Sequence, residues 1–454
     1  MPRRRVRSFK ASENVVDSDS KARKSPFNKR KSSPLLASKF KWILIYACPL
    51  LLLLLLAHTF HLLPGRWIHG SKHAVTVVDS ELSVYEKGLV KSDNTYQQVL
   101  AEAEKSWINT THRHFNSMVL AYVTPWNSKG YDMAIKFRAK FTHVSPVWYQ
   151  LKRIGTELQL FGKHDADQQW MAQVRKHGLP LILPRVALEG SPIELLTKKR
   201  ERKQAYELIV SECKNMGFDG VVLEAWSQWA AYGILKDPNL RQMALQFVQE
   251  LGSMLHTAKT VDGLDRNLQL VFVIPPLNSI ENNPDMFTST DMARVSNNVD
   301  GFSLMTYDFS STYRPGPNAP IGWVHACLQY LLPVSAAKRQ RDTKIDMKTV
   351  SYQLAGKILM GINFYGNDFV LPRGGAPILG HEYLSLLRTH KPKLFWDEQS
   401  MEHYFDYEER LNRHRVFYPS LKSISLRLEE AQTWGVGLSI WEIGQGLEYF
   451  FDLL

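Results

Sequence analysis

The sequence contains little cysteine for its length, with only Cys48, Cys213 and Cys327 among 454 residues. An odd and widely spaced set of cysteines excludes a disulfide framework of the kind that stabilises small secreted domains. Cys48 lies in a long apolar segment. Cys213 and Cys327 lie in segments that we expect to form distant helices, too far apart for the alternative of a disulfide bond between them.

The sequence also lacks the patterns of nucleotide and metal sites. Pro372-Arg373-Gly374-Gly375-Ala376 has no Gly-Lys-Ser/Thr ending, so it is not a phosphate-binding loop and reads as a surface turn. His143, His164 and His177 occur at unrelated spacings, which favours structural or solvated side chains over metal ligands. We therefore expect no metal and no cofactor.

Positive charge is scarce outside the first residues of the chain. The formal net charge is +12, yet residues 1–41 alone hold 13 Lys and Arg against 3 Asp and Glu. Residues 64–454 hold 43 against 41 and are close to neutral. A nucleic-acid-binding domain would carry its basic surplus on the folded part, so we expect no nucleic-acid partner.

Residues 42–63 contain no Asp, Glu, Lys or Arg and include seven consecutive leucines. At about 1.5 Å per residue, this segment spans roughly 33 Å as a helix and predicts a transmembrane signal anchor. The basic residues before it place a disordered tail, residues 1–41, in the cytosol. The alternative is a signal peptide whose removal releases a secreted protein, although such peptides have shorter apolar stretches.

This topology describes a single-pass type II membrane protein with its folded part in the lumen of the endoplasmic reticulum, Golgi or lysosome, or outside the cell. Residues 64–116 then form a stalk and a segment that packs on the domain. Within them, Asn109-Thr110-Thr111 is a glycosylation sequon on the non-cytosolic side.

Eight short apolar runs recur from residue 117 onward, separated by stretches of helical character. They begin near Met118, Phe141, Leu179, Gly217, Leu268, Val299, Lys357 and Val436. Doubly buried strands that alternate with helices are typical of a parallel sheet, and eight such units over 117–454 predict an α/β fold, the (β/α)8 TIM barrel. Amphipathic patterns predict helices at 165–176 and 420–433, and the wide gap 367–434 leaves room for a small insertion before the last helix.

The functional site of such a barrel lies at the carboxyl ends of its strands. The residues expected there combine aromatic rings with a few polar groups: Tyr122, Trp148, Glu224, Trp226, Met305, Tyr307, Asp308, Asn363, Tyr365 and Trp441. Rings pack against the C–H faces of sugars while polar groups bind hydroxyls, so this set favours a substrate-binding site for sugars. The alternative is that the rings only cap the barrel core.

Several of these segments resemble the glycoside hydrolase family 18 chitinases. Met305-Thr306-Tyr307-Asp308 matches the sixth-strand Met-x-Tyr-Asp, and Gly361-Ile362-Asn363-Phe364-Tyr365-Gly366 is similar to the seventh-strand Gly-x-x-Phe-Tyr-Gly. Tyr122 and Trp441 match aromatic residues of the first and eighth strands. Leu183-Pro184-Arg185-Val186 departs from the family's third-strand Ser-x-Gly-Gly. The resemblance covers 117–454 and implies a barrel that binds N-acetylated oligosaccharides.

The fourth strand, in Gly217–Trp226, is similar to the family signature Asp-Gly-x-Asp-x-Asp-x-Glu. With Asp219 on the first Asp, Glu224 takes the place of the third acidic residue and Trp226 that of the proton-donating Glu. Val222, Glu224 and Trp226 alternate, so we expect all three on the interior face. Asp219 is expected to be a structural turn residue.

Indole has no proton to transfer near neutral pH, and general acid catalysis contributes about 10²–10⁴-fold to such reactions. The resemblance therefore implies a chitinase-like binding protein with no catalytic residue. One alternative is a weak hydrolase that uses Glu224, although we expect Glu224 to anchor Tyr307 by a hydrogen bond. The other is a protein-interaction module that docks a sorting receptor or a secreted partner.

The topology can be tested with protease on intact microsomes. We expect the full-length chain to behave as an integral membrane protein whose folded part is protected, because residues 42–63 are long enough to span the bilayer. Recovery of a soluble mature chain that starts between Ala57 and Ser71 would show that the apolar segment is cleaved.

Overall fold

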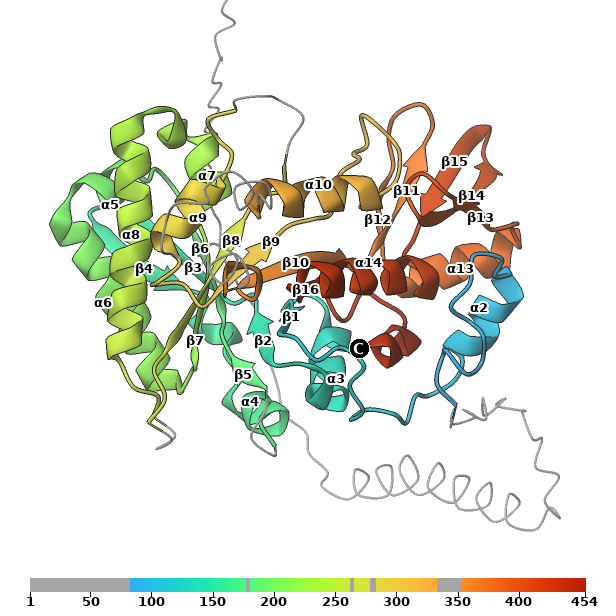
Figure 1. Ribbon diagram of the computed structural model, residues 1–454, viewed down its shortest axis with the longest axis horizontal. Helices are drawn as coiled ribbons and strands as arrows, with labels where there is room; N and C mark the ends of the chain where they lie inside the picture. The colour runs from blue at the N-terminus through green and yellow to red at the C-terminus, as the bar shows by residue number, and fades with distance from the viewer. Residues whose placement is uncertain (1–81, 177–179, 262–264, 278–282, 333–352) are drawn as a thin grey trace, which may run out of the picture. The chain divides into compact units, whose positions relative to one another are not determined.

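The computed structural model describes residues 82–454, apart from gaps at 177–179, 262–264, 278–282 and 333–352 (Figure 1). These residues belong to one compact unit, Val75–Leu454. The expected tail 1–41 and anchor 42–63 lie outside the described residues. Among the helices that are described, none is both long and apolar enough to cross a membrane.

Parallel strands form the central sheet of this unit. They are β1 (Val119–Val123), β2 (His143–Pro146), β5 (Leu181–Ile182) followed by β6 (Arg185–Leu188), β7 (Gly220–Glu224), β8 (Gln269–Ile274), β9 (Gly301–Leu304), β10 (Ile358–Asn363) and β16 (Gly437–Trp441). Each of the eight apolar runs in the sequence contributes to this set. The strand segments are buried on both faces almost throughout, which is why they appear as apolar runs.

The sheet curls until its two ends meet in a single interrupted strand. β5 pairs with β2 and β6 pairs with β7, both in parallel. The intervening residues continue the pairing, because Leu183 N donates to Val144 O and Val222 N donates to Pro184 O, each at 3.0 Å. Pro184 has no N–H to donate and so interrupts the ladder. β5 and β6 are two halves of one barrel strand, and the α/β barrel predicted from the sequence is present.

Helices cover the outside of the barrel (Figure 1). They are α3 (Ser128–Lys136), α4 (Gln168–Val174), α5 (Ile193–Thr197), α6 (Lys199–Met216), α7 (Trp226–Ala231), α8 (Pro238–Thr257), α9 (Ser289–Val295), α10 (Ile321–Leu331) and α14 (Leu421–Trp434), with short 3-10 helices η1 (Arg138–Lys140), η2 (Lys163–Asp165), η3 (Ile234–Lys236) and η4 (Glu448–Leu453). α4 and α14 confirm the two amphipathic helices. Ser420 caps α14 by accepting from Ser423 N at 3.2 Å, and Gly435 ends it with a left-handed φ of 68°.

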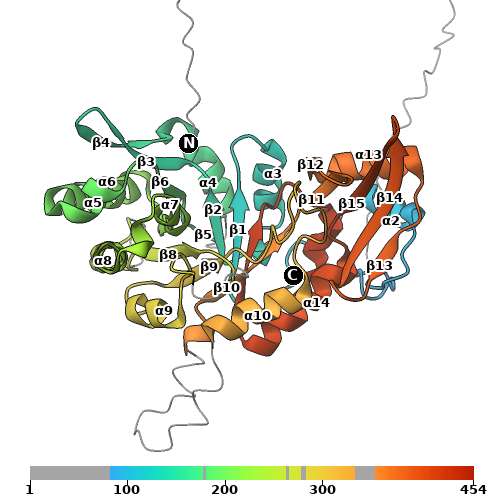
Figure 2. The same ribbon diagram turned by 90° about the horizontal axis from the view of Figure 1, so that it is seen from above.

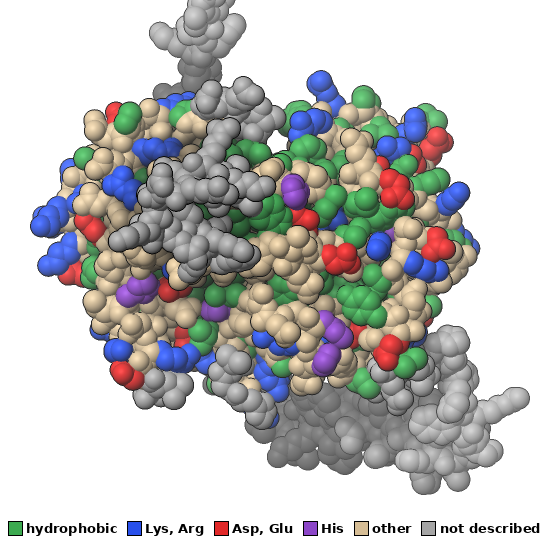
Figure 3. All heavy atoms as spheres, viewed as in Figure 1, with side chains coloured by type: hydrophobic (Ala, Val, Ile, Leu, Met, Phe, Trp, Pro, Cys, Tyr) green, Lys and Arg blue, Asp and Glu red, His purple; other side chains and the backbone are tan. Residues whose placement is uncertain are grey.

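Two additions extend the barrel. The hairpin of β3 (Tyr149–Ile154) and β4 (Glu157–Phe161) follows β2 and pairs with β6, and the sequence did not reveal it. The small insertion falls in the predicted gap. It is an antiparallel sheet of β11 (Gly366–Val370), β12 (Ala376–Ile378), β13 (Phe395–Asp397), β14 (Glu402–Glu409) and β15 (Asn412–Phe417), with α13 (Gly380–His390). On the face in Figure 3, acidic and basic side chains are interspersed over this region, in keeping with the near-neutral charge of 64–454.

The described segment before the barrel packs on the outside of the barrel. α2 (Tyr96–Ala103) lies beside α13 and contacts η4 (Figure 2). Val84 N donates to Asp452 Oδ2 at 2.7 Å, and Trp107 N donates to Glu448 Oε1 at 2.8 Å. These bonds hold the segment against the end of the chain. Cys213 and Cys327 are both buried free thiols, so no disulfide joins them.

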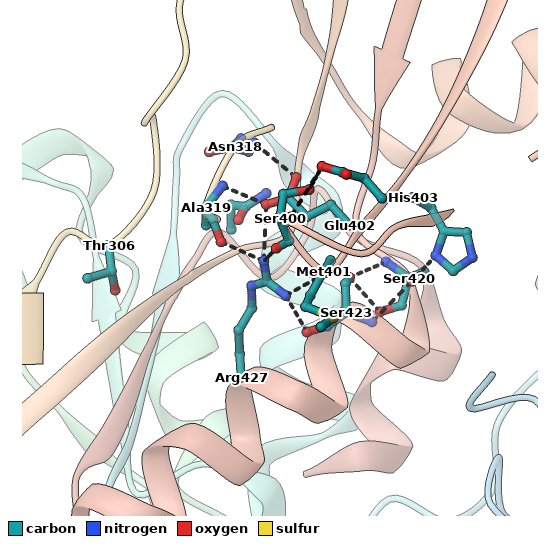
Figure 4. Close-up of polar contacts among 12 residues, drawn as sticks. Thr306, Asn318, Ala319, Ser400, Met401, Glu402, His403, Ser420, Ser423 and Arg427 are labelled. Atoms are coloured by element: carbon teal, nitrogen blue, oxygen red, sulfur yellow. Dashed lines mark hydrogen bonds and ion pairs between the residues drawn. The ribbon is translucent and has the colours of Figure 1, made fainter. Parts of the chain in front are cut away.

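A buried ion pair ties the insertion to helix α14 (Figure 4). Arg427 Nη2 lies 3.1 Å from Glu402 Oε1, and the Arg427 side chain is only 5% exposed. Its nitrogens also donate to the carbonyl oxygens of Met401, Ser423 and Ala319 at 3.0, 2.7 and 2.5 Å. Burial lowers the pKa of the Arg427 guanidinium, whereas Glu402 acts in the opposite direction. The pair is well supplied with hydrogen bonds, which a buried charge requires.

Removing one partner of this pair should be costly. We expect Arg427→Met to lower the free energy of unfolding by about 3–5 kcal/mol, because Glu402 is left buried without its counter-charge. Arg415→Met is a matched control, since the Arg415–Asp406 pair is about one-third exposed and should contribute less than about 1 kcal/mol. Urea unfolding of both variants measures the difference, and equal losses would contradict this role of Arg427.

Candidate functional site

An apolar stack fills the barrel interior and ends in an aromatic floor at the carboxyl ends of the strands. Its buried members are Leu120, Tyr122, Val147, Leu183, Val222, Val271, Val273 and Leu359, with Met118, Leu181, Met305 and Trp441 partly buried against them. The rings of Tyr122 and Trp441 lie 5.3 Å apart between centroids and are tilted by 55°. Trp441 therefore combines a partly exposed ring with support from the core beneath it.

Tyr122 sits deeper than Trp441 and is locked in place. Its hydroxyl donates to Ser303 Oγ at 2.9 Å, which joins β1 to β9 across the interior. Burial raises the pKa of the Tyr122 hydroxyl, and the nearby charge of Glu224 raises it further. Tyr122 consequently stays neutral and acts as a rigid surface under the mouth.

Tyr307, Asp308, Asn363 and Tyr365 contact one another where β9 and β10 end. Tyr365 donates a short hydrogen bond from its hydroxyl to Asp308 Oδ1, and Asn363 Nδ2 donates to Tyr365 O at 2.8 Å. The Tyr307 ring lies against Gly361, where an added Cβ would stand 2.8 Å from Tyr307 Cε1. The structure thus brings together residues from the ends of β9 and β10 that the sequence placed at the site.

The loop that carries Asp308 is fixed by the ion pair of the insertion. Asp308 has a left-handed φ of 61°, and its N–H donates to Asn318 Oδ1 at 2.7 Å. Asn318 N in turn donates to Glu402 Oε2 at 2.9 Å (Figure 4). Burial raises the pKa of the Asp308 carboxyl, while the hydrogen bond from Tyr365 lowers it. The Glu402–Arg427 pair therefore reaches the site through Asn318.

Glu224 enters the mouth from the end of β7 and pairs with Arg185 on β6. Arg185 Nε donates to Glu224 Oε2 at 2.5 Å, and the two side chains are 17% and 29% exposed. Burial is the largest single influence on the pKa of the Arg185 guanidinium and lowers it, but the hydrogen bond and charge of Glu224, together with Tyr122 and Tyr307, raise it overall. The expectation that Glu224 anchors Tyr307 is wrong, because its hydrogen-bond partner is Arg185.

Arg185 was missed as a site residue. It stands two positions after the interior residue Leu183, and Val186 next to it belongs to the outer core, so alternation directs Arg185 inward. The signal in the sequence was a single charged residue within an otherwise apolar strand. A buried charge requires a partner, and Glu224 supplies it.

Trp226 does not lie on the interior face, contrary to the sequence-based expectation. Strand β7 ends at Glu224 and helix α7 begins at Trp226, so the alternation stops between them. The Trp226 ring is 1% exposed and packs edge-on against Phe287, with ring centroids 4.9 Å apart. Its Nε1 donates to Asp285 O at 2.7 Å. Trp226 therefore belongs to the layer between barrel and helices.

Trp148 is likewise placed away from the mouth. It is fully buried outside the barrel, where its Nε1 donates to the Tyr131 hydroxyl at 2.7 Å and its ring meets Trp170 edge-on. The interior residue next to it is Val147. Asp219, by contrast, has the structural role expected of it, since Oδ2 accepts from Ile182 N at 2.8 Å and Arg175 pairs with the same oxygen.

Glu442 is a fully buried carboxyl that follows Trp441. Its oxygens accept from Asn127 Nδ2 and Gly444 N, both at 2.6 Å, and from Thr124 Oγ1 at 3.4 Å. Burial raises the pKa of Glu442 to about 7 despite these hydrogen bonds. The carboxyl connects the end of β16 to the start of α3 beside the aromatic floor.

Two further expectations concern groups outside this cluster. Among the described residues, no set of three or more His, Cys, Asp or Glu side chains is arranged to hold a metal ion. Asn109 is half-buried, and its Nδ2 donates to Asp452 Oδ1 at 3.1 Å. That nitrogen is the atom to which a glycan would be attached, and a glycan there would leave it a single N–H for this hydrogen bond.

The curled parallel sheet and its helices define an α/β barrel, and sequence comparison identifies the family. The profile of glycosyl hydrolases family 18 matches residues 191–446, more than half of the chain. The protein therefore belongs to glycosyl hydrolases family 18.

Individual relatives are distant. The cortical fragment-lytic enzyme of Bacillus subtilis (strain 168) is 23% identical over 260 residues, and the match covers 55% of this chain and about half, 52%, of that enzyme. The crystal structure of a chitinase from Chromobacterium violaceum superposes with a TM-score of 0.59 at 20% identity, covering 74% of this chain and 98% of that one. A chitinase from Cycas revoluta, solved in complex with (GlcNAc)3, superposes with a TM-score of 0.55 at 16% identity and again covers 74% of this chain and 98% of that one. These structural likenesses concern the fold.

Glu442 predicts an unusual pH dependence of stability. A carboxyl whose pKa is higher in the folded than in the unfolded chain binds its proton more tightly when folded. The stability that Glu442 contributes is therefore fully present below pH ~4.5 and is lost as the pH rises to about 7. The shift corresponds to roughly 3 kcal/mol. We expect the stability advantage of Glu442→Gln over the parent to grow by about that amount between pH 5 and pH 8. Parallel unfolding curves at both pH values would contradict it.

Proposed function

We propose that this protein binds N-acetylated oligosaccharides or related glycans at the barrel mouth without cleaving them. The observation that carries the proposal is the absence of a proton donor among the residues at the end of the fourth barrel strand, β7. The carboxylate that reaches the mouth there, Glu224, is paired with Arg185, and a carboxylate in an ion pair has no proton to donate to a leaving group. Trp226, at the position of the family's acid, is part of the outer core.

The binding half of the proposal rests on the aromatic floor. Trp441 presents a partly exposed ring supported by Tyr122, while Tyr307, Asp308, Asn363 and Tyr365 offer hydrogen-bonding groups beside it. A ring with adjacent polar groups suits one face of a sugar. The Cycas revoluta chitinase of the same fold was solved with (GlcNAc)3, which supports an N-acetylated ligand here.

Two alternatives remain part of the proposal. In the first, the protein is a weak hydrolase whose working carboxylate is Glu224, which is about one-third exposed at the mouth, in line with the lytic relatives. A protein-interaction module would instead use the barrel face to dock a sorting receptor.

We further propose that residues 42–63 anchor the chain with the barrel in the lumen or outside the cell, or are cleaved to release it. Ala121–Asn127 and Asp300–Asp308 are similar to segments of chitinase domain-containing protein 1, a finer resemblance within the family.

Binding and hydrolysis should be measured side by side on the full-length protein. We expect binding of chitooligosaccharides and no turnover of a fluorogenic chitobioside from acidic to mildly basic pH. Trp441→Ala should lower the affinity by about 1–3 kcal/mol, because it removes a buried aromatic anchor.

Phe395→Ala, at an exposed ring of the insertion, is the control and should bind like the parent. Turnover by the parent that disappears in Glu224→Gln would show that the protein is a hydrolase and that Glu224 is its catalytic carboxylate. A parent protein that neither binds nor cleaves glycans would favour the interaction module.

A further inference from the structure

Among the residues that the structure describes, the Arg185 guanidinium is hydrogen-bonded through one of its nitrogens. Nε donates to Glu224, and within the described part of the chain Nη1 and Nη2 have no hydrogen-bond partner. A guanidinium has five N–H donors. The side chain as a whole is only 17% exposed, yet neither terminal nitrogen is among the fully buried atoms that lack a partner, so the remaining donors are open to solvent and to a ligand.

Glu224 offers a matching acceptor at the same place. Its Oε2 binds Arg185, whereas Oε1 has no partner among the described residues. The pair thus presents free donors and a free acceptor next to one another. The Arg415–Asp406 pair of the insertion is arranged differently, because Arg415 donates to both oxygens of Asp406, at 2.7 and 2.8 Å.

The charge of the pair limits what can bind to it. Arg185 and Glu224 cancel, so an anion or a cation placed against them would bring an uncompensated charge into a partly buried site. An uncharged ligand with a neighbouring donor and acceptor meets no such penalty. Arg185 is in register with Val222 and stands two residues after Leu183, and both of these belong to the same interior cluster as Tyr122 and Trp441, which places the pair near the aromatic floor.

We propose that Arg185 and Glu224 form the specificity-determining pair of the sugar site and bind two neighbouring polar groups of one uncharged sugar ring. A hydroxyl or acetamido N–H donates to Glu224 Oε1, and an adjacent hydroxyl oxygen accepts from the Arg185 guanidinium. The inference rests on the proposed glycan-binding function and names the groups that would be read. It also gives a role to the strand that departs from the family pattern.

Titration calorimetry of the full-length protein with neutral chitotriose tests the pair. We expect Arg185→Gln to weaken binding about 10- to 100-fold, as for lost hydrogen bonds to a charged group, and Arg185→Lys to recover part of that loss. Arg415→Gln removes an equivalent arginine from the insertion and should leave the affinity unchanged. Unaltered affinity in folded Arg185→Gln would overturn the inference while leaving the glycan-binding proposal intact.

Monodeoxy derivatives of chitotriose separate contact from a merely structural role. At least one derivative should bind the parent about tenfold more weakly than chitotriose and lose nothing further in Arg185→Gln, because the same hydrogen bond is removed from either side. Strictly multiplicative losses for every derivative would overturn the inference.

A charged ligand tests the argument that the Arg185–Glu224 pair favours uncharged sugars. A trimer that carries a carboxylate at C6 should bind no more tightly than chitotriose, with little dependence on salt. Tighter, salt-sensitive binding of the acidic trimer would overturn the inference in favour of an anion site. A parent that binds no glycan at all would overturn the proposed function as well.

Discussion

The alternation of side chains along the barrel strands is the constraint on which the remaining structure depends. Each doubly buried strand sends one set of residues into the interior stack and the other into the helix layer. β7 shows how sharply this operates: Val222 faces the interior stack, while Leu223 belongs to the outer core. Where the strand ends, the rule ends too. Trp226 lies only two residues beyond Glu224, yet a helix has begun and the ring turns outward.

The second constraint is the cost of burying charge. Glu402, Arg427, Glu224 and Arg185 are all withdrawn from water to a considerable degree, and each has its counter-charge within hydrogen-bond distance. The insertion and α14 are joined by one pair, and the strands β6 and β7 by the other. The first pair also reaches the mouth, because Glu402 binds the backbone of Asn318, which in turn binds Asp308. The insertion is therefore part of the support of the site.

The two ion pairs differ in how far the surrounding protein satisfies the hydrogen-bond donors of their arginines. Arg427 is satisfied by carbonyl oxygens around it and serves stability. Among the residues that the structure describes, the terminal nitrogens of Arg185 have no hydrogen-bond partner, and Arg185 lies near the ring floor of Tyr122 and Trp441. That contrast separates a structural ion pair from one that is available to a ligand.

Local pattern in the sequence determined much of this protein. The eight apolar runs, the two amphipathic helices and the gap that holds the insertion follow from burial on two faces and from helical periodicity. The strand ends also bring Tyr122 to Trp441 and Asp308 to Tyr365. The hairpin after β2, the outward rings of Trp148 and Trp226, and the pairing of Arg185 with Glu224 were decided only by the tertiary structure. Where a strand stops, and which charge meets which across neighbouring strands, depends on contacts between segments far apart in the chain, and no periodicity within a single segment records them.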